Sequence, residues 1–136
     1  MRNTLIDAGP LIALFDKSDR YHAKAISFLK KFEGSLFTTW PVVTEVSHML
    51  AFSTKTQINF FKWINRGGLE ILELEHPHLL RIIELSEKFK DVPMDLADAT
   101  LIVASELKNI SQIASVDSDF YVYRNIRKKY LTNIFI

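Results

Sequence analysis

The chain has 136 residues, of which 48% are hydrophobic, and it contains no cysteine. This length fits a single domain spanning residues 1–136 with a packed core, and the missing thiols exclude disulfides and thiolate metal sites. The apolar stretches are shorter than the roughly 20 residues that span a bilayer, and the N-terminal residues lack the apolar region of a signal peptide. We therefore expect a cytoplasmic protein with no membrane partner.

Short β-prone runs alternate with helical patterns along the chain. Strands are expected at residues 4–6, 35–38, 69–74 and 110–116, and a last apolar run lies at 131–136. Helices are expected at 11–15, from a cap at Ser18 or Asp19 to about 32, from 39 to about 52, and at 54–65, 77–89 and 94–107. This alternation predicts an α/β fold with a central parallel sheet of about five short strands and helices on both faces. Ligands of such sheets bind beyond the carboxyl ends of the strands.

Two aspartates follow directly on predicted strands. Asp7 comes after Thr4-Leu5-Ile6, and Asp117 comes after the run that ends at Val116. Because the carboxyl ends of parallel strands share one edge of the sheet, we expect both carboxylates at the functional edge. Aspartate is also common in turns and helix caps, which is the alternative interpretation of each residue taken alone.

A third aspartate lies within an apolar helix. The segment 94–107 is apolar nearly all round and should be buried, yet Asp98 is in it, and Asp95 stands three residues earlier on the same face. A buried carboxylate costs several kcal/mol unless it is protonated, paired or bound to metal. The alternatives are that Asp95 caps the helix and that Asp98 pairs with an Arg or Lys.

Glu45 lies at the edge of the apolar stripe of its predicted helix, where it can point toward a neighbouring cleft; the alternative is an ordinary boundary glutamate. Together, Asp7, Glu45, Asp98 and Asp117 form an oxygen-rich set that suits Mg²⁺ or Mn²⁺. Such ions activate water for attack on phosphorus, so no nucleophilic Ser or Cys is required.

The net charge of +1 hides a separation of charge. Six of the 16 acids are candidate site residues, namely the five acids above and Asp119. The other ten acids and the 17 basic residues give the rest of the chain a net charge of +7. A basic body around an acidic pocket suits a polyanion, although a surface of mixed charge is the simpler interpretation. The basic residues with a candidate role in binding substrate are Arg124, Arg127, Lys128 and Lys129, which are interleaved with Tyr121, Tyr123 and Tyr130.

Basic and aromatic side chains together favour single-stranded RNA, whereas a basic surface turn is the alternative. Lys17, Arg20 and His22 follow the first strand–helix turn and can contact a substrate phosphate, or else form a solvated helix start. The region from Trp40 to Trp63 contains more large apolar residues than two short helices need for one core face, which suggests an association surface.

Four segments resemble the PIN-domain family, and within it the small VapC-type toxins of toxin–antitoxin pairs. They are residues 5–14, 43–46, 95–99 and 115–120. The resemblance implies that Asp7, Glu45, Asp98 and Asp117 bind metal, with Asp95 as an accessory. It also implies Mg²⁺- or Mn²⁺-dependent cleavage of RNA by a homodimer that a small antitoxin holds inactive. Ser115 stands where the family often has Thr, and it joins the candidate substrate-binding residues; Gly9 stands where many members have Ser or Thr.

Two other functions compete with a ribonuclease. A phosphotransfer domain of the receiver or haloacid-dehalogenase type also places Asp at strand ends, but Asp7-Ala8-Gly9 lacks the additional acids that these families need. The stronger alternative is a catalytically inactive PIN-like module that binds RNA or protein.

Overall fold

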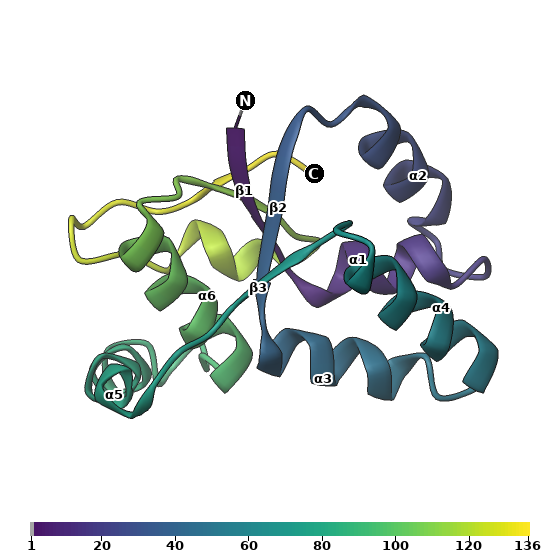
Figure 1. The fold of residues 1–136 in the computed structure, drawn as a ribbon. Coiled ribbons are helices and arrows are strands. Elements are labelled where there is room, and N and C mark those ends of the chain that lie inside the picture. The colour runs from purple at the N-terminus through teal and green to yellow at the C-terminus, as the bar shows by residue number, and fades with distance from the viewer. Residues whose placement is uncertain (1) are drawn as a thin grey trace.

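The computed structural model describes residues 2–136 and contains one parallel sheet of five short strands (Figure 1). The strands lie in the order β3-β2-β1-β4-β5. Their bounds are β1 Arg2–Ile6, β2 Gly34–Thr39, β3 Glu70–Leu72, β4 Gln112–Ala114 and β5 Thr132–Asn133. All four strand pairs are parallel, which confirms the predicted fold class.

Helices cover both faces of the sheet. Figure 1 shows α5 and α6 on one side of the central strands and α1, α2 and α4 on the other, while α3 leaves the carboxyl end of β2. The helices are α1 Ala8–Phe15, α2 His22–Lys31, α3 Trp40–Met49, α4 Thr54–Asn65, α5 Leu79–Lys88 and α6 Leu96–Lys108, with 3₁₀ turns η1 His76–His78 and η2 Ser118–Tyr121. Among residues 2–136, none of these helices has the length and apolar character needed to cross a membrane.

The ends of several elements differ from the predictions. Helix α1 begins at Ala8, because the Asp7 carboxylate caps it. Pro10 is tolerated in the first turn, because backbone N–H groups there form no hydrogen bond within the helix. The predicted cap of α2 at Ser18 or Asp19 is wrong: α2 begins at His22, and Asp19 accepts a hydrogen bond from the Tyr21 backbone in the preceding turn. Strands β4 and β5 are shorter than predicted.

Helix α6 is the most buried helix near the sheet edge. Its consecutive residues from Asp98 to Ser105 are all buried, whereas Leu96 and Leu107 at its ends are half exposed, so the expectation of burial all round holds only for the middle of the helix. The Asp95 side chain caps it by accepting a hydrogen bond from the Asp98 backbone N–H. The helix therefore carries Asp98 in its first turn, at the end nearest the carboxyl edge of the sheet.

Candidate metal centre

Three carboxylates meet at the carboxyl edge of the sheet. One oxygen each of Asp7, Asp98 and Asp117 lies within 4.8 Å of the others. Strands β1 and β4 are neighbours, with Ile6 paired to Ala114, so the residues that follow them emerge side by side. Asp98 is added from α6, which packs beside this edge. The structure thus brings together three of the acids predicted from the sequence.

Asp7 is fixed by two hydrogen bonds. Its Oδ1 accepts the Ala8 backbone N–H at 2.8 Å, and its Oδ2 accepts the Ser115 hydroxyl at 3.1 Å. The Ser115 Oγ in turn accepts the Asp117 backbone N–H at 2.9 Å. Ser115 is fully buried, and its hydroxyl links the first and last acids of the cluster.

Asp98 is held by Tyr123, one of the tyrosines expected to accompany the basic residues at the RNA. The Tyr123 hydroxyl donates a hydrogen bond of 2.9 Å to Asp98 Oδ2. The Tyr123 ring is fully buried and packs edge-on against Phe89 and Phe120. Tyr123 is therefore unavailable for stacking on RNA, although Tyr121 and Tyr130 are exposed.

The electrostatics of the cluster are those of crowded like charges. Burial, followed by the negative charge of Asp95, raises the pKa of Asp98 to about 7, against a lowering effect of the Tyr123 hydrogen bond. Burial also raises the pKa of Asp7 to about 6, although its hydrogen bonds to Ala8 and Ser115 oppose the shift. Within residues 2–136, no Arg or Lys forms an ion pair with these acids, so the alternative in which Asp98 meets a basic side chain is wrong.

Glu45 and Asp95 lie at the rim of the cluster. Glu45 is exposed on α3, and partial burial together with the charges of Asp95 and Asp117 raises its pKa. Asp95 is also exposed, and its side chain serves as the cap of α6. Glu45 and Asp95 are thus within electrostatic reach of the cluster but outside the group of three oxygens.

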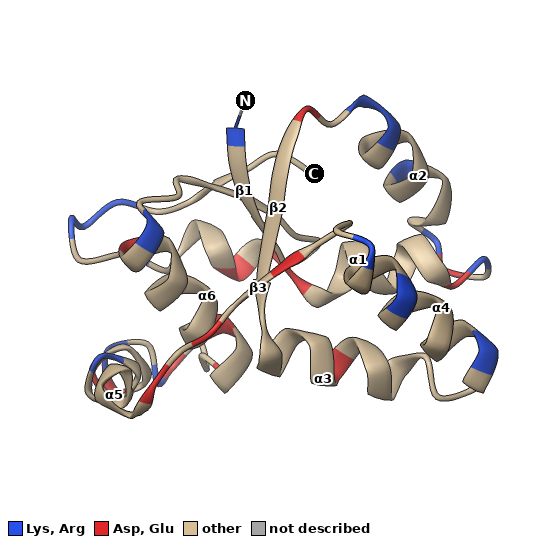
Figure 2. Cartoon of the chain, in the orientation of Figure 1, with Lys and Arg blue, Asp and Glu red and all other residues tan. Residues whose placement is uncertain are grey.

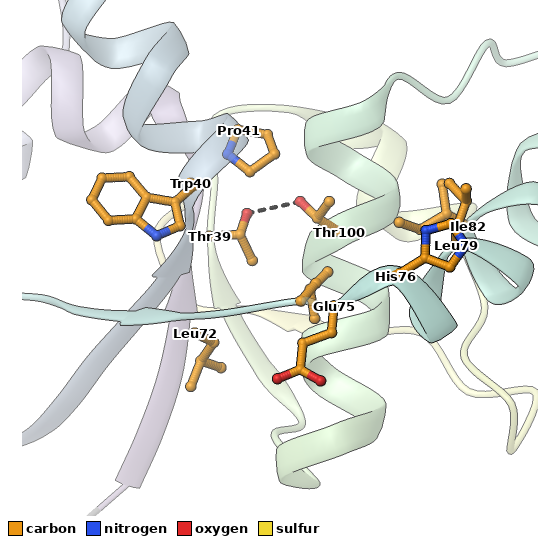
Figure 3. A pocket seen from close by; sticks show the side chains of 10 residues that line it. Thr39, Trp40, Pro41, Leu72, Glu75, His76, Leu79, Ile82 and Thr100 are labelled. Atoms are coloured by element: carbon orange, nitrogen blue, oxygen red, sulfur yellow. Dashed lines mark hydrogen bonds between the residues drawn. The ribbon is translucent and has the colours of Figure 1, made fainter.

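A hydroxyl pair fastens α6 to the sheet beside the acids. Thr39, at the end of β2, and Thr100 on α6 form a buried hydrogen bond of 2.7 Å, drawn as a dashed line in Figure 3. Because the Thr100 hydroxyl also donates to the Ala97 carbonyl, Thr39 is the donor within the pair. The pair lies in a largely apolar hollow of about 270 Å³ and fixes the helical turn that carries Asp98.

A larger hollow of about 630 Å³ adjoins the acids. Glu45 and Asp95 give it acidic character, while Trp40 and Leu96, both half exposed, give it apolar walls. Trp40 belongs to the region expected to carry surplus apolar groups. In that region Met49, Phe52 and Phe61 are also exposed, whereas Phe60 is buried and Trp63 packs against Phe15.

Arg127 of the basic C-terminal segment lies away from the acids, although the segment is close to Asp117 in sequence. Arg127 donates to the Asn109 side chain at the far end of α6, and the Ile126 backbone donates to Glu106. Asp98 and Asn109 are eleven residues apart on this helix, roughly 16 Å. The Arg124 guanidinium is bonded to the carbonyls of residues 121–123 and stacks on Tyr130, whereas Lys128 and Lys129 are exposed.

Comparison with known proteins identifies the family. The family model of the PIN domain matches residues 4–126. The chain belongs to the PIN-domain family. No curated protein matches the chain as a sequence relative.

Two solved structures share its fold. One is the VapC20 toxin of Mycobacterium tuberculosis, described as cleaving the sarcin–ricin loop, with a TM-score of 0.79 and 15% identity over 88% of this chain and 93% of that chain. The other is VapBC2 of Rickettsia felis, bound to a DNA fragment from its promoter, with a TM-score of 0.63 and 14% identity over 96% of both chains.

The departure from the PIN pattern at Gly9 has a steric cause. A Cβ added at this position would lie 2.3 Å from Val116 Cγ2. In this chain the Val116 side chain, which follows β4, occupies the space that a Ser or Thr at position 9 would need. Glycine at position 9 therefore allows α1 to approach the segment that carries Asp117.

Proposed function

We propose that this PIN-domain protein is a divalent-metal-dependent endoribonuclease of the VapC toxin type. The observation that carries the proposal is the group of three carboxylate oxygens, from Asp7, Asp98 and Asp117, within 4.8 Å of one another at the carboxyl edge of the sheet. Membership of the PIN family and the shared fold with a toxin described as cleaving the sarcin–ricin loop support the same function.

The chemistry of the acids fits Mg²⁺ or Mn²⁺. Both ions prefer carboxylate oxygens and keep several waters, which a half-open cluster permits. Asp7 and Asp98 are buried without a basic partner, and burial raises the pKa of each, so a bound cation would stabilise their ionised forms. Asp7, Asp98 and Asp117 would hold the ion, while Glu45 and Asp95 would act from the rim, either as further ligands or through bound water.

The protein's own groups prepare this site. When bound, the divalent ion supplies activation of water and charge stabilisation at a phosphodiester group. Ser115 orients the Asp7 carboxylate, and Tyr123 orients that of Asp98. Glu45 is exposed toward solvent with a raised pKa, which makes its carboxylate a stronger acceptor for a proton released from water. These roles require no covalent intermediate on the protein.

Cleavage of a labelled RNA with Mg²⁺ or Mn²⁺, set against chelator, tests the proposed activity. Asp98→Asn should abolish cleavage, because it removes an anionic oxygen while nearly preserving shape. Asp91→Asn is the matched control, since this exposed acid lies outside the cluster and should leave cleavage unchanged. An Asp98→Asn protein that cleaves at the parent rate would refute the site, and would leave an RNA- or protein-binding PIN module.

The proposal extends to an inhibitory partner. The hollow beside the acids combines the apolar walls of Trp40 and Leu96 with the carboxylates of Glu45 and Asp95. An amphipathic antitoxin segment fits this lining, with apolar side chains on the walls and one Arg or Lys directed to the acids, where it replaces the charge of the cation. Co-expression with the product of any small reading frame that adjoins the gene tests the partner. A product that neither binds this chain nor restores growth would leave a stand-alone nuclease.

A further inference from the structure

A third hollow lies at the end of α1 that is remote from Asp7. It is formed where α1 ends, by Phe15 and Lys17, and where α4 begins, by Phe52, Lys55 and Asn59, and it has a volume of about 570 Å³. This volume is in the range of sites that hold a ligand of nucleotide size. We call it the Phe52 hollow.

The lining of the Phe52 hollow combines an exposed ring with free cations. Phe52 is 65% exposed, which is unusual for a side chain of this size. Lys17 and Lys55 are both exposed, and within the part of the chain that the structure describes neither is in an ion pair. One carboxylate also lines the hollow, that of Asp16, and it already accepts hydrogen bonds from the Ser18 backbone and hydroxyl. The two lysines outweigh it, so the hollow is net positive.

The base of the hollow is rigid. The Phe15 ring packs edge-on against Phe60 and Trp63, with ring centroids 5.4 and 5.5 Å away. Phe60 is fully buried, so this side of the hollow is part of the core. Asn59 and Thr56 add amide and hydroxyl groups to the lining. A flat, hydrogen-bonding and anionic ligand suits these features better than a purely apolar one.

The position of the hollow relates it to the acids. Helix α1 is capped by Asp7 and ends at Phe15, and α3, which carries Glu45, packs alongside α1 (Figure 1). The eight residues of α1 correspond to a length of about 12 Å. This is the length of about three or four stacked nucleotides at roughly 3.4 Å each. Figure 2 shows blue segments on α4 and both blue and red segments on the connection between α1 and α2, while other red segments lie nearer the centre of the molecule.

We propose that the Phe52 hollow binds an unpaired nucleotide of the RNA, a few positions from the cleaved bond, with the base stacked on Phe52 and phosphates near Lys17 and Lys55. The proposal rests on the ribonuclease function proposed above. Aromatic stacking combined with a positive groove is the general way in which proteins hold single-stranded nucleic acid. A second copy of the chain fits less well, because a twofold contact centred here would bring the lysines of both copies together.

Binding of a fluorescein-labelled single-stranded RNA, followed by fluorescence anisotropy at several salt concentrations, tests the proposal. The Asp98→Asn chain serves as background because it should not cleave the probe. Phe52→Leu, which keeps an apolar side chain but removes the ring, should weaken binding about tenfold or more. Lys17→Ala with Lys55→Ala should reduce the slope of log affinity against log salt by about 1.4, which corresponds to two lost phosphate contacts on a single strand.

Matched controls lie on the opposite side of the molecule. Leu80→Ala on α5 alters an equally exposed apolar residue, and Lys88→Ala with Lys90→Ala removes two charges at the end of α5. These variants should bind RNA like the background chain. The proposal is overturned if the hollow variants match the controls. It is also overturned if Phe52→Leu leaves RNA binding unchanged and instead dissociates a dimer in light scattering, or abolishes the binding of an acidic protein.

The nucleotide subsite and the ribonuclease function can be refuted separately. If the parent chain cleaves RNA with Mg²⁺ and the hollow variants bind like the controls, the subsite is wrong and the ribonuclease function stands. If no RNA is cleaved but the hollow variants lose affinity and salt dependence, the subsite stands on a protein that binds RNA without cleaving it.

Discussion

The hydroxyl of Tyr123 donates a 2.9 Å hydrogen bond to Oδ2 of Asp98, and both side chains are buried. Asp98 has no basic partner within residues 2–136, so this neutral donor is its main polar contact outside its own helix. Tyr123 is itself fixed by the rings of Phe89 and Phe120. A buried carboxylate of the cluster is thus oriented by a group with no charge.

Replacing Tyr123 with Phe should weaken divalent-metal binding while preserving the fold. The ring packing remains and only the donor is lost, so Asp98 becomes free to turn away from Asp7 and Asp117. Loss of a group that orients a metal ligand typically costs about 10- to 100-fold in metal affinity. Titration of Mn²⁺ by calorimetry or electron paramagnetic resonance measures the effect, and Tyr121→Phe, at an exposed tyrosine, is the control. Equal Mn²⁺ affinities of the two variants would show that the hydrogen bond does not position Asp98.

Gly9 and Val116 should behave as a coupled pair. Gly9→Ala places a Cβ 2.3 Å from Val116 Cγ2, so we expect a loss of stability of about 1–3 kcal/mol. Val116→Ala removes the clashing methyl groups and should make Gly9→Ala less harmful when the two are combined. Chemical denaturation of the two single variants and the double variant measures the coupling free energy. Additive effects would show that the backbone, not the valine, determines the choice of glycine at position 9.

The positions of the acids were predictable because they follow from the parallel sheet. Asp7 and Asp117 follow neighbouring strands, and the carboxyl ends of such strands meet at one edge whatever the side-chain detail. Asp98 was predictable because a carboxylate in an apolar helix is costly unless it has a partner. The capping role of Asp95 and the rim position of Glu45 were open alternatives, because helical periodicity gives the direction of a side chain only relative to its own helix.

The role of Tyr123 and the location of the basic segment were not predictable in this way. Both depend on the path of the chain after η2, where closeness in sequence to Asp117 does not imply closeness in space. Tyr123 turns inward to Asp98, whereas Arg127 continues to the far end of α6. The spacing of Tyr121 and Tyr123 contained no signal, since residues two apart in an extended segment face the same side.

Self-association should involve the exposed apolar residues Trp40 and Met49 of α3, outside the Phe52 hollow. Trp40 is 53% exposed and Met49 is 54% exposed, and two such large apolar side chains exposed on one short helix suggest a surface that is covered by another chain. We expect a homodimer in light scattering at micromolar concentration, and Trp40→Ser with Met49→Ser should shift it toward the 15.7 kDa monomer. Leu80→Ser with Ile83→Ser, on α5, is the control. A parent chain that is monomeric under these conditions would refute the dimer.

The stability of the metal-free protein should fall as the pH rises from about 4 to about 8. The pKa of Asp7 is raised to about 6 and that of Asp98 to about 7, chiefly by burial, from an ordinary value of 3.8. Between these values the folded chain binds more protons than the unfolded chain, so deprotonation favours unfolding. The stabilising effect of the protonated acids is fully present below pH 3.8 and is lost as the pH passes through about 6 and 7. The total change is on the order of a few kcal/mol.

Thermal unfolding across this pH range in chelator, repeated with Mn²⁺, measures the effect. Asp98→Asn cannot ionise, so its melting temperature should depend less on pH between 6 and 8 and should equal or exceed that of the parent chain at pH 8. Mn²⁺ should stabilise the parent chain more at pH 8 than at pH 5, because protons compete with the cation for the same oxygens. A melting temperature of the metal-free parent that rises between pH 5 and pH 8, in step with that of Asp98→Asn, would show that the buried acids do not carry the repulsion that the geometry implies.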